Sequence, residues 1–351
     1  MVLIFFFFMF QRDSQILCIT YLFACARDDS AAVRSSAIRA LAIFVLFPSL
    51  KEDGLFLSDT IDVALSSAID EHNNVRAQSA WLLGNVTEAL ASNKAADFDD
   101  GVTDSAVLNM LHICIQLAGD APKIRPGALR AIGNLLSIFD RDRIENNKEQ
   151  VARGIGALLK NAAEGSFMKA RWNSCYAVAN VLRNPFVLAA EDWTVSIIDA
   201  MTSLLQNYKN FKVRIGAGCA LTVPPDRRHY RDRFHSVWKA VFSALDNSKN
   251  IADYSEYQHR DQLIDQLCLV MCHLSSLLEF DDLLFLGEAF NHHLDSVQYH
   301  MKLFQSRIVP EKSDLVLKAL DKISGLIITT PLKTKQYKTL EMLRNLFADD
   351  R

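Results

Sequence analysis

Proline and glycine are scarce in this chain, with 8 and 13 among 351 residues. This scarcity excludes a collagen-like chain, and an apolar fraction of 50% excludes general disorder. The chain also has no large excess of positive or negative charge, because 38 basic and 41 acidic residues leave a formal net charge of −3. The chain therefore lacks the overall positive charge on which unspecific nucleic-acid binding depends.

The sequence also lacks the signatures of common enzyme families. It contains no glycine-rich phosphate loop, no Gly-x-Ser-x-Gly, no His-Glu-x-x-His and no Cys-x-x-Cys. We therefore expect no enzymatic activity, no cofactor and no small-molecule substrate.

The seven cysteines do not suggest disulfides or a metal site. Their number is odd and most lie in apolar segments, which is typical of free thiols in a reducing compartment. Cys268, Cys272 and His273 lie on one predicted helix, but a four-ligand zinc site needs further ligands that the sequence does not show. We interpret them as core residues and expect no metal.

The first ten residues, MVLIFFFFMF, form an apolar run that is too short to span a bilayer, which needs about 20 residues. Two interpretations are open. Residues 1–13 are a hydrophobic stub at the truncated start of a longer chain, or they belong to a signal peptide cleaved near Ala24-Cys25-Ala26. We prefer the stub, because no basic segment precedes the run. We therefore expect a cytoplasmic or nuclear protein that is not secreted.

One phrase recurs five times: a small or β-branched residue, an arginine, and an alanine-rich helical segment. Its arginines are Arg34, Arg76, Arg125, Arg171 and Arg214, separated by 42, 49, 46 and 43 residues. A period in the forties without strand signals is typical of stacked helical hairpins of the HEAT or armadillo type. The sequence therefore predicts an all-α fold, an α-solenoid that winds into a right-handed superhelix.

Polar turns divide each repeat into two helices, and the recurring phrase opens the second one. The expected helix pairs are 15–26 with 31–47, 57–70 with 75–91, 104–118 with 123–139, 147–163 with 168–183, and 193–207 with 211–223. We predict five such hairpins over 14–225 and a solvated, charged connection at 226–233. Less regular helices over 234–351 are expected to cap the same solenoid.

Three segments resemble the HEAT repeat-containing protein 6-like family: VRAQSAWLLGNVTEAL, ARWNSCYAVANVLRNP and FKVRIGAGCALTVPPDRRHY. The resemblance covers roughly residues 14–350 and is strongest between 75 and 230. It implies an armadillo-type superhelix at the end of a much longer chain. It also implies a general binding role without enzymatic activity.

Three repeats carry a candidate peptide-binding pair on one face of the second helix. The pairs are Trp81 with Asn85, Arg130 with Asn134, and Tyr176 with Asn180. This spacing is similar to the Trp-x-x-x-Asn arrays of armadillo importins and β-catenin-like proteins. The resemblance implies that the asparagines hold a peptide backbone and the aromatic rings hold basic side chains.

A structural role for the same residues is an open alternative, in which the asparagines bond to the adjacent repeat and the aromatic rings pack. Ile43 and Val223 interrupt the series in the first and fifth repeats. The five arginines of the phrase, the Arg ladder, have a different expected role. A cation at a helix start opposes the macrodipole, so we expect these arginines to bond carbonyl or acidic groups of a turn or neighbouring repeat.

These observations favour an interaction scaffold that binds a partner peptide or helix on its concave face. A first alternative is a karyopherin-like adaptor for a basic peptide, which acidic residues beside Trp81 and Tyr176 would favour and a basic face would oppose. A second is a nucleic-acid-binding solenoid. It would require one stripe that contains Arg130, Arg153, Lys160, Lys169 and the arginines of 226–233.

Overall fold

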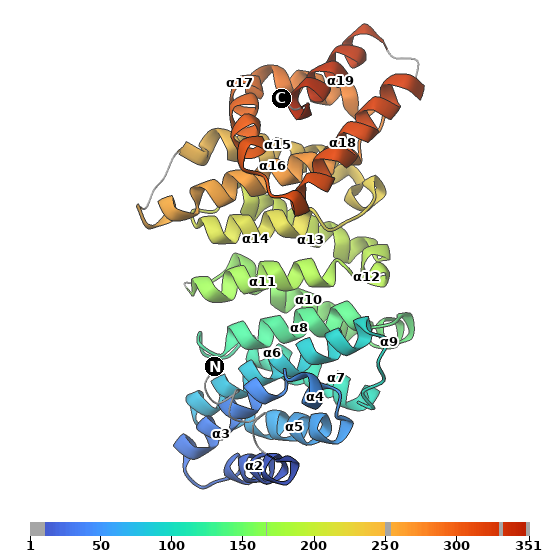
Figure 1. The fold of residues 1–351 in the computed structure, drawn as a ribbon. Helices are drawn as coiled ribbons and strands as arrows, with labels where there is room; N and C mark the ends of the chain where they lie inside the picture. Colours follow the sequence, from blue (N-terminus) through green and yellow to red (C-terminus); the bar gives the residue numbers. More distant parts are fainter. Residues whose placement is uncertain (1–10, 166, 250–253, 330–332, 349–351) are drawn as a thin grey trace. The chain divides into compact units, whose positions relative to one another are not determined.

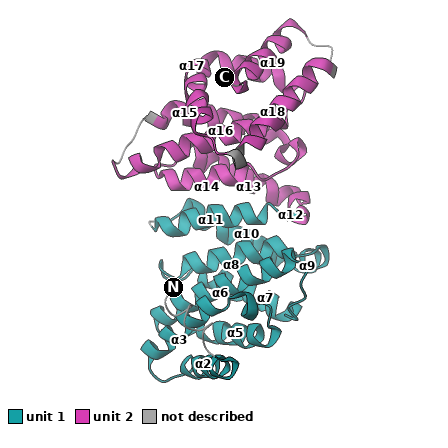
Figure 2. Ribbon diagram, viewed as in Figure 1, with its two compact units in different colours: residues 1–184 teal, residues 185–351 magenta. Residues whose placement is uncertain are grey.

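The computed structural model describes residues 11–165, 167–249, 254–329 and 333–348. Within these residues the regular elements are helices and no strand occurs, which confirms the predicted all-α fold (Figure 1). The chain divides into two compact units, residues 1–184 (unit 1) and 185–351 (unit 2) (Figure 2). Of the hydrophobic stub predicted for 1–13, residues 1–10 lie outside the described residues.

Unit 1 is a stack of four helical hairpins. Their helices are α2 (Arg12–Cys25) with α3 (Ala31–Phe44), α5 (Gly54–Ser67) with α6 (Asn73–Ala95), α7 (Asp104–Leu117) with α8 (Arg125–Ile138), and α10 (Lys148–Ala163) with α11 (Met168–Val181). Two short helices, α4 (Pro48–Lys51) and α9 (Arg141–Asn146), lie in the connections between hairpins. The second helices pack on one another in the order α3, α6, α8 and α11.

Side-chain caps begin several of these helices. Asp53 accepts a hydrogen bond from the backbone N–H of Phe56 at 3.0 Å, and Asp140 accepts one from Arg143 at 2.9 Å. Such caps satisfy backbone donors that have no partner inside the helix.

Glycines permit close packing between the second helices. A Cβ atom on Gly127 would lie 2.4 Å from the carbonyl oxygen of Ala80, and one on Gly133 would lie 2.6 Å from the Cα of Ala177. A Cβ atom does not come this close to atoms outside its own residue and its chain neighbours, so α8 can approach α6 and α11 only because it carries no side chain at these positions.

Unit 2 begins with α12 (Pro185–Ala189) and a hairpin of α13 (Glu191–Asn207) and α14 (Phe211–Leu221). The helices that follow are α15 (Phe234–Asp246), α16 (Arg260–Ser276), α17 (Asp282–Arg307), α18 (Pro310–Thr329) and α19 (Thr334–Phe347). Its core includes the fully buried rings of Trp238, Phe242 and Phe290, with Phe242 and Phe290 centred 5.0 Å apart.

The connection at 226–233 differs from the solvated loop that its charges predict. Arg227–Arg233 form a 3-10 helix, in which Arg231 has a φ of 50° that is uncommon for a residue other than glycine. Tyr230 is fully buried, and its hydroxyl donates to the carbonyl oxygen of Leu221 at 2.5 Å. His273 Nε2 lies 3.1 Å from the same hydroxyl, which connects α16 to this segment.

Candidate functional site

The first two arginines of the Arg ladder each connect two repeats. Arg34 Nη2 lies 2.8 Å from Asp70 Oδ2, and Arg76 Nε lies 2.7 Å from Asp120 Oδ2. Each arginine also donates to two carbonyl oxygens in the turn that precedes its own helix. The hydrogen bond from Arg76 lowers the pKa of Asp120. Both arginines therefore join a turn to a carboxylate of the following repeat.

The other three arginines of the ladder donate to backbone carbonyl groups. Arg125 Nε donates to Asp120 at 2.6 Å, and Arg171 donates to the carbonyls of residues 162, 163 and 165. Arg214 donates to Leu205 at 2.8 Å and Ala244 at 3.2 Å, and burial lowers its pKa to about 10. These side chains lie within the packing of the hairpins.

The three asparagines of the candidate pairs bond to the preceding repeat. Asn85 is 2% exposed, and its amide donates to the carbonyl of Ala42. Asn134 Nδ2 lies 3.4 Å from the carbonyl oxygen of Gly84, and Asn180 Nδ2 lies 3.1 Å from Asn134 Oδ1. Each amide is therefore already engaged between neighbouring second helices.

The other member of each pair lies closer to solvent. Trp81 is half-buried, and Tyr176 is 46% exposed. Arg130 holds the equivalent position in the repeat between those of Trp81 and Tyr176. Its Nη2 lies 3.4 Å from the carbonyl oxygen of Trp81 and also donates a hydrogen bond to Asn85 Oδ1. Its Nη1 lies 3.5 Å from Glu88 Oε2, and burial lowers the pKa of Arg130 against the opposite effect of Glu88.

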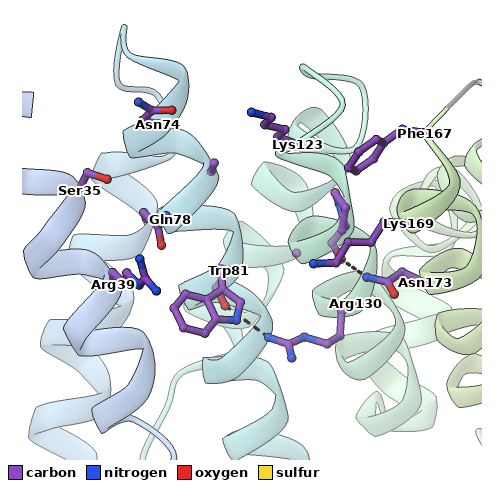
Figure 3. A pocket seen from close by; sticks show the side chains of 13 residues that line it. Ser35, Arg39, Asn74, Gln78, Trp81, Lys123, Arg130, Phe167, Lys169 and Asn173 are labelled. Carbon is purple, nitrogen blue, oxygen red and sulfur yellow. Dashed lines mark hydrogen bonds between the residues drawn. The ribbon is translucent and has the colours of Figure 1, made fainter. Parts of the chain in front are cut away.

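A groove of about 830 Å³ crosses the second helices of unit 1, and we call it the basic groove. Figure 3 shows Arg39 on α3, Trp81 on α6 and Arg130 on α8 in succession across it, with Lys169 and Asn173 on α11. The charged and aromatic residues that line it are Arg39, Lys123, Arg130, Lys169, Trp81 and Phe167. No carboxylate is among the described residues of its walls.

Helical spacing explains why these residues share a wall. Counted from the arginine of each phrase, the lining residues of α6, α8 and α11 fall at positions −2, +1, +2 and +5. These positions are three, four and seven residues apart, so they form one stripe along a helix. Trp81 and Arg130 occupy position +5, and Arg39 occupies the same position in the first repeat.

A second, smaller cavity of about 300 Å³ shares Arg130 and Asn173 with the basic groove. Its walls also contain Glu88, Asn134, Tyr176 and Asn180. Five of the six candidate peptide-binding residues therefore line one cavity or the other, whereas Asn85 lines neither of the two.

Arg39, Lys123 and Phe167 were not predicted as site residues, and Lys169 was considered only as part of a nucleic-acid-binding stripe. A signal for the lysines was present, because position −2 of the phrase is Lys123 in the third repeat and Lys169 in the fourth. Arg39 was not recognised as a candidate because the residue four positions after it is Ile43, whereas the second, third and fourth repeats have an asparagine there.

The cations that would form a nucleic-acid stripe do not lie on one surface of unit 1. Arg130 and Lys169 line the basic groove, but Lys160 lines a different cavity and Arg153 is exposed on α10, a first helix. In unit 2 the four arginines of the 226–233 connection each lie within 4 Å of a carboxylate.

The described residues contain no cluster of three or more metal-binding side chains. Cys268 and Cys272 are fully buried, and burial raises the pKa of both thiols, that of Cys272 to about 12. None of the helices in the described part of the chain combines the length and apolar character needed to cross a membrane.

The chain matches no model of a known protein family. It is similar to a putative uncharacterized protein of Dictyostelium discoideum, with 23% identity over 398 aligned positions, 82% of this chain and 26% of the relative. The chain thus spans about a quarter of the length of that curated relative.

Among solved structures, an engineered protein has a TM-score of 0.45 and 17% identity over 71% of this chain and 98% of its own. A designed armadillo repeat protein has a TM-score of 0.44 and 13% identity, over 71% of this chain and 99% of its own. Another designed armadillo repeat protein, solved with the peptide (KR)4, has a TM-score of 0.41 with the same identity and coverage.

Proposed function

We propose that this chain is a non-catalytic scaffold that binds a segment of a protein partner in the basic groove of unit 1. The observation that carries this proposal is the groove itself. It is a stripe of second-helix side chains that combines exposed cations, a half-buried tryptophan and amide groups on one surface. Mixed apolar and hydrogen-bonding walls are typical of sites that bind a polypeptide segment.

The amides suit a peptide backbone. Gln78 and Asn74 line the groove on α6, and Asn173 lines it on α11. An amide side chain offers two donors and an acceptor, so it can pair with both the N–H and the C=O groups of an extended chain. Trp81 supplies an apolar surface, and tryptophan is among the residues that most often dominate binding energy.

Two alternatives have less support. A karyopherin-like adaptor for basic peptides would need acidic walls. Four cations line the groove beside Trp81 instead. The smaller cavity beside Tyr176 contains one carboxylate, that of Glu88. A nucleic-acid-binding solenoid would need a continuous basic stripe, and Arg153 and Lys160 lie away from the groove.

We also propose that the chain acts inside the cell. All seven cysteines are free thiols, which is typical of proteins in a reducing compartment. A relationship to HEAT repeat-containing protein 6-like proteins remains part of this proposal.

A steric block of the groove tests the proposed function without changing its charge. In a variant that combines Ser35→Trp with Ala77→Trp, two bulky rings fill the wall between α3 and α6. We expect this variant to lose a defined set of partners in affinity purification followed by mass spectrometry, because the rings occupy the space of the bound segment.

The control is Ala152→Trp on the exposed surface of α10, away from the groove. Circular dichroism verifies that both variants keep the helical content of the wild type. Equal partner recovery by the groove variant, the control and the wild type would refute binding at this site.

A further inference from the structure

We propose that the segment bound in the basic groove is an acidic peptide. Its aspartate or glutamate side chains meet Arg39, Lys123 and Lys169, and an apolar side chain among them contacts Trp81. This inference rests on the proposed function, because it assigns the chemistry of the partner segment for the same groove.

The charge of the groove is the first argument. Arg39, Lys123 and Lys169 are exposed, and within the described residues none of the three has an ion pair or a side-chain hydrogen bond. Like charges that share one surface repel each other, and a partner of opposite charge removes this repulsion and associates faster. Arg34 and Arg76 differ, because each already has an aspartate at less than 3 Å.

The helix ends strengthen the same preference. Lys123 lies two residues before the start of α8, and Lys169 is the second residue of α11. The macrodipole places partial positive charge at these helix N-termini, where anionic groups are stabilised. The lysines and the dipoles therefore act in the same direction at this end of the groove.

Arg130 has a different part in the site. Its guanidinium is held by the carbonyl of Trp81, by Asn85 and by Glu88, so its position is set before a partner arrives. Because Glu88 already balances its charge, we assign the acidic side chains of the peptide to the other three cations.

A peptide fits the groove better than a nucleic acid does. Trp81 and Phe167 are the aromatic residues among those lining the groove, whereas single-stranded nucleic acids need a succession of rings on which bases stack. The three amides of the wall match a peptide backbone. The whole chain also carries a formal net charge of −3, which weakens its attraction to a long polyanion.

Selection from a random 12-residue peptide library on the full chain tests the proposal. We expect the recovered peptides to be rich in aspartate and glutamate with an apolar or aromatic residue between them. Each recovered peptide is then synthesised with a fluorescent label, together with a neutral copy in which glutamine and asparagine replace the acids. Fluorescence anisotropy with the wild type should show binding about tenfold weaker for the neutral copy.

Charge reversal in the protein gives the second measurement. The variant Arg39→Glu with Lys169→Glu should lose about tenfold in affinity for the acidic peptides, because two attractive contacts become repulsive. The control Lys148→Glu with Arg153→Glu has the same change in net charge on exposed residues of α10 and should keep the wild-type affinity.

Four results would overturn the proposal. They are recovery of basic or neutral peptides, recovery of no peptide above background, an equal loss in the groove variant and its control, and tighter binding of a 12-nucleotide single-stranded RNA than of any acidic peptide. If one of the first three occurs while the tryptophan block still removes partners, the groove binds a protein segment of other chemistry and the proposed function stands.

Discussion

His273 and Tyr230 are two buried polar side chains that meet beneath the 226–233 connection. His273 Nε2 lies 3.0 Å from the carbonyl oxygen of Pro224 and 3.1 Å from the hydroxyl of Tyr230. Burial lowers the pKa of His273 to about 4, although the bond to Pro224 acts in the opposite direction. The imidazole is therefore neutral in the folded chain at neutral pH and near pH 5.

This pKa makes the stability of unit 2 depend on pH. Above pH 6.5 the histidine is neutral in both the folded and the unfolded chain, so it adds no pH dependence. As the pH falls below 6.5, the unfolded chain takes up a proton that the folded chain does not bind. We expect a loss of about 2 kcal/mol in the free energy of unfolding between pH 8 and pH 5, measured by urea denaturation.

The variant His273→Gln should show a smaller loss over the same pH range, because glutamine can donate to Pro224 but does not titrate. His292→Gln, at an exposed position of α17, is the control and should keep the wild-type loss. A pH dependence that is the same in all three proteins would exclude His273 as its source.

Single residues also show where sequence reasoning failed. Tyr230 stands among arginines and aspartates, so its segment was expected to be solvated, yet its ring is completely buried. Burial of one aromatic ring from a charged segment depends on a space between helices that are distant in the sequence. No local pattern contains that information.

The periodicity of the sequence predicted the positions of the long helices in the hairpins. The expected helix over 75–91 lies inside α6, and that over 193–207 lies inside α13. The short helices α4 and α12 were not among the expected helices, because each begins with a proline, a residue that commonly ends a helix. Proline is also well suited to the first turn of a helix, where its missing N–H costs nothing, and both short helices begin with it.

The close contact between α8 and α11 leads to a prediction for Gly133. In Gly133→Ala the new Cβ would lie 2.6 Å from the Cα of Ala177, so the two helices must separate. We expect a destabilisation of about 1–3 kcal/mol, despite the better helix propensity of alanine, in chemical denaturation.

Gly156→Ala is the matched control, because a Cβ at this position of α10 has no atom within 4 Å. It should leave stability unchanged or raise it by up to about 1 kcal/mol. Equal stabilisation in both variants would show that α8 and α11 do not need a glycine at their contact.

The candidate site was predicted in part at the level of the element. Trp81, Arg130 and Tyr176 hold the same position on three successive second helices, which follows from helical geometry alone, and each lines the basic groove or the smaller cavity. The bonds of the asparagines to neighbouring repeats could not be predicted, because they depend on how closely second helices approach. That approach is set by contacts such as the one at Gly127.

At the scale of the whole molecule, each unit has a core of its own. In a helical-repeat protein each hairpin contacts mainly its neighbours, so stability is close to a sum of local contributions. We expect Gly133→Ala to increase amide hydrogen exchange in α8, α10 and α11, measured by mass spectrometry, while α15 to α19 in unit 2 keep their wild-type rates. An equal increase in both units would mean that the chain unfolds as one cooperative body.

The bonds of Arg34 and Arg76 have a consequence for how this chain could change in evolution. Each of these arginines finds an aspartate in the turn of the next repeat, at Asp70 and Asp120. Loss of the second repeat as a unit would place Arg34 opposite Asp120 and restore an equivalent pair. The Arg–Asp pairs at the first two junctions are therefore interchangeable, and we expect the loss or gain of one repeat there to preserve this contact. Arg125 and Arg171 instead bond to carbonyl groups of the turn in their own repeat, so this exchange of partners does not extend to them.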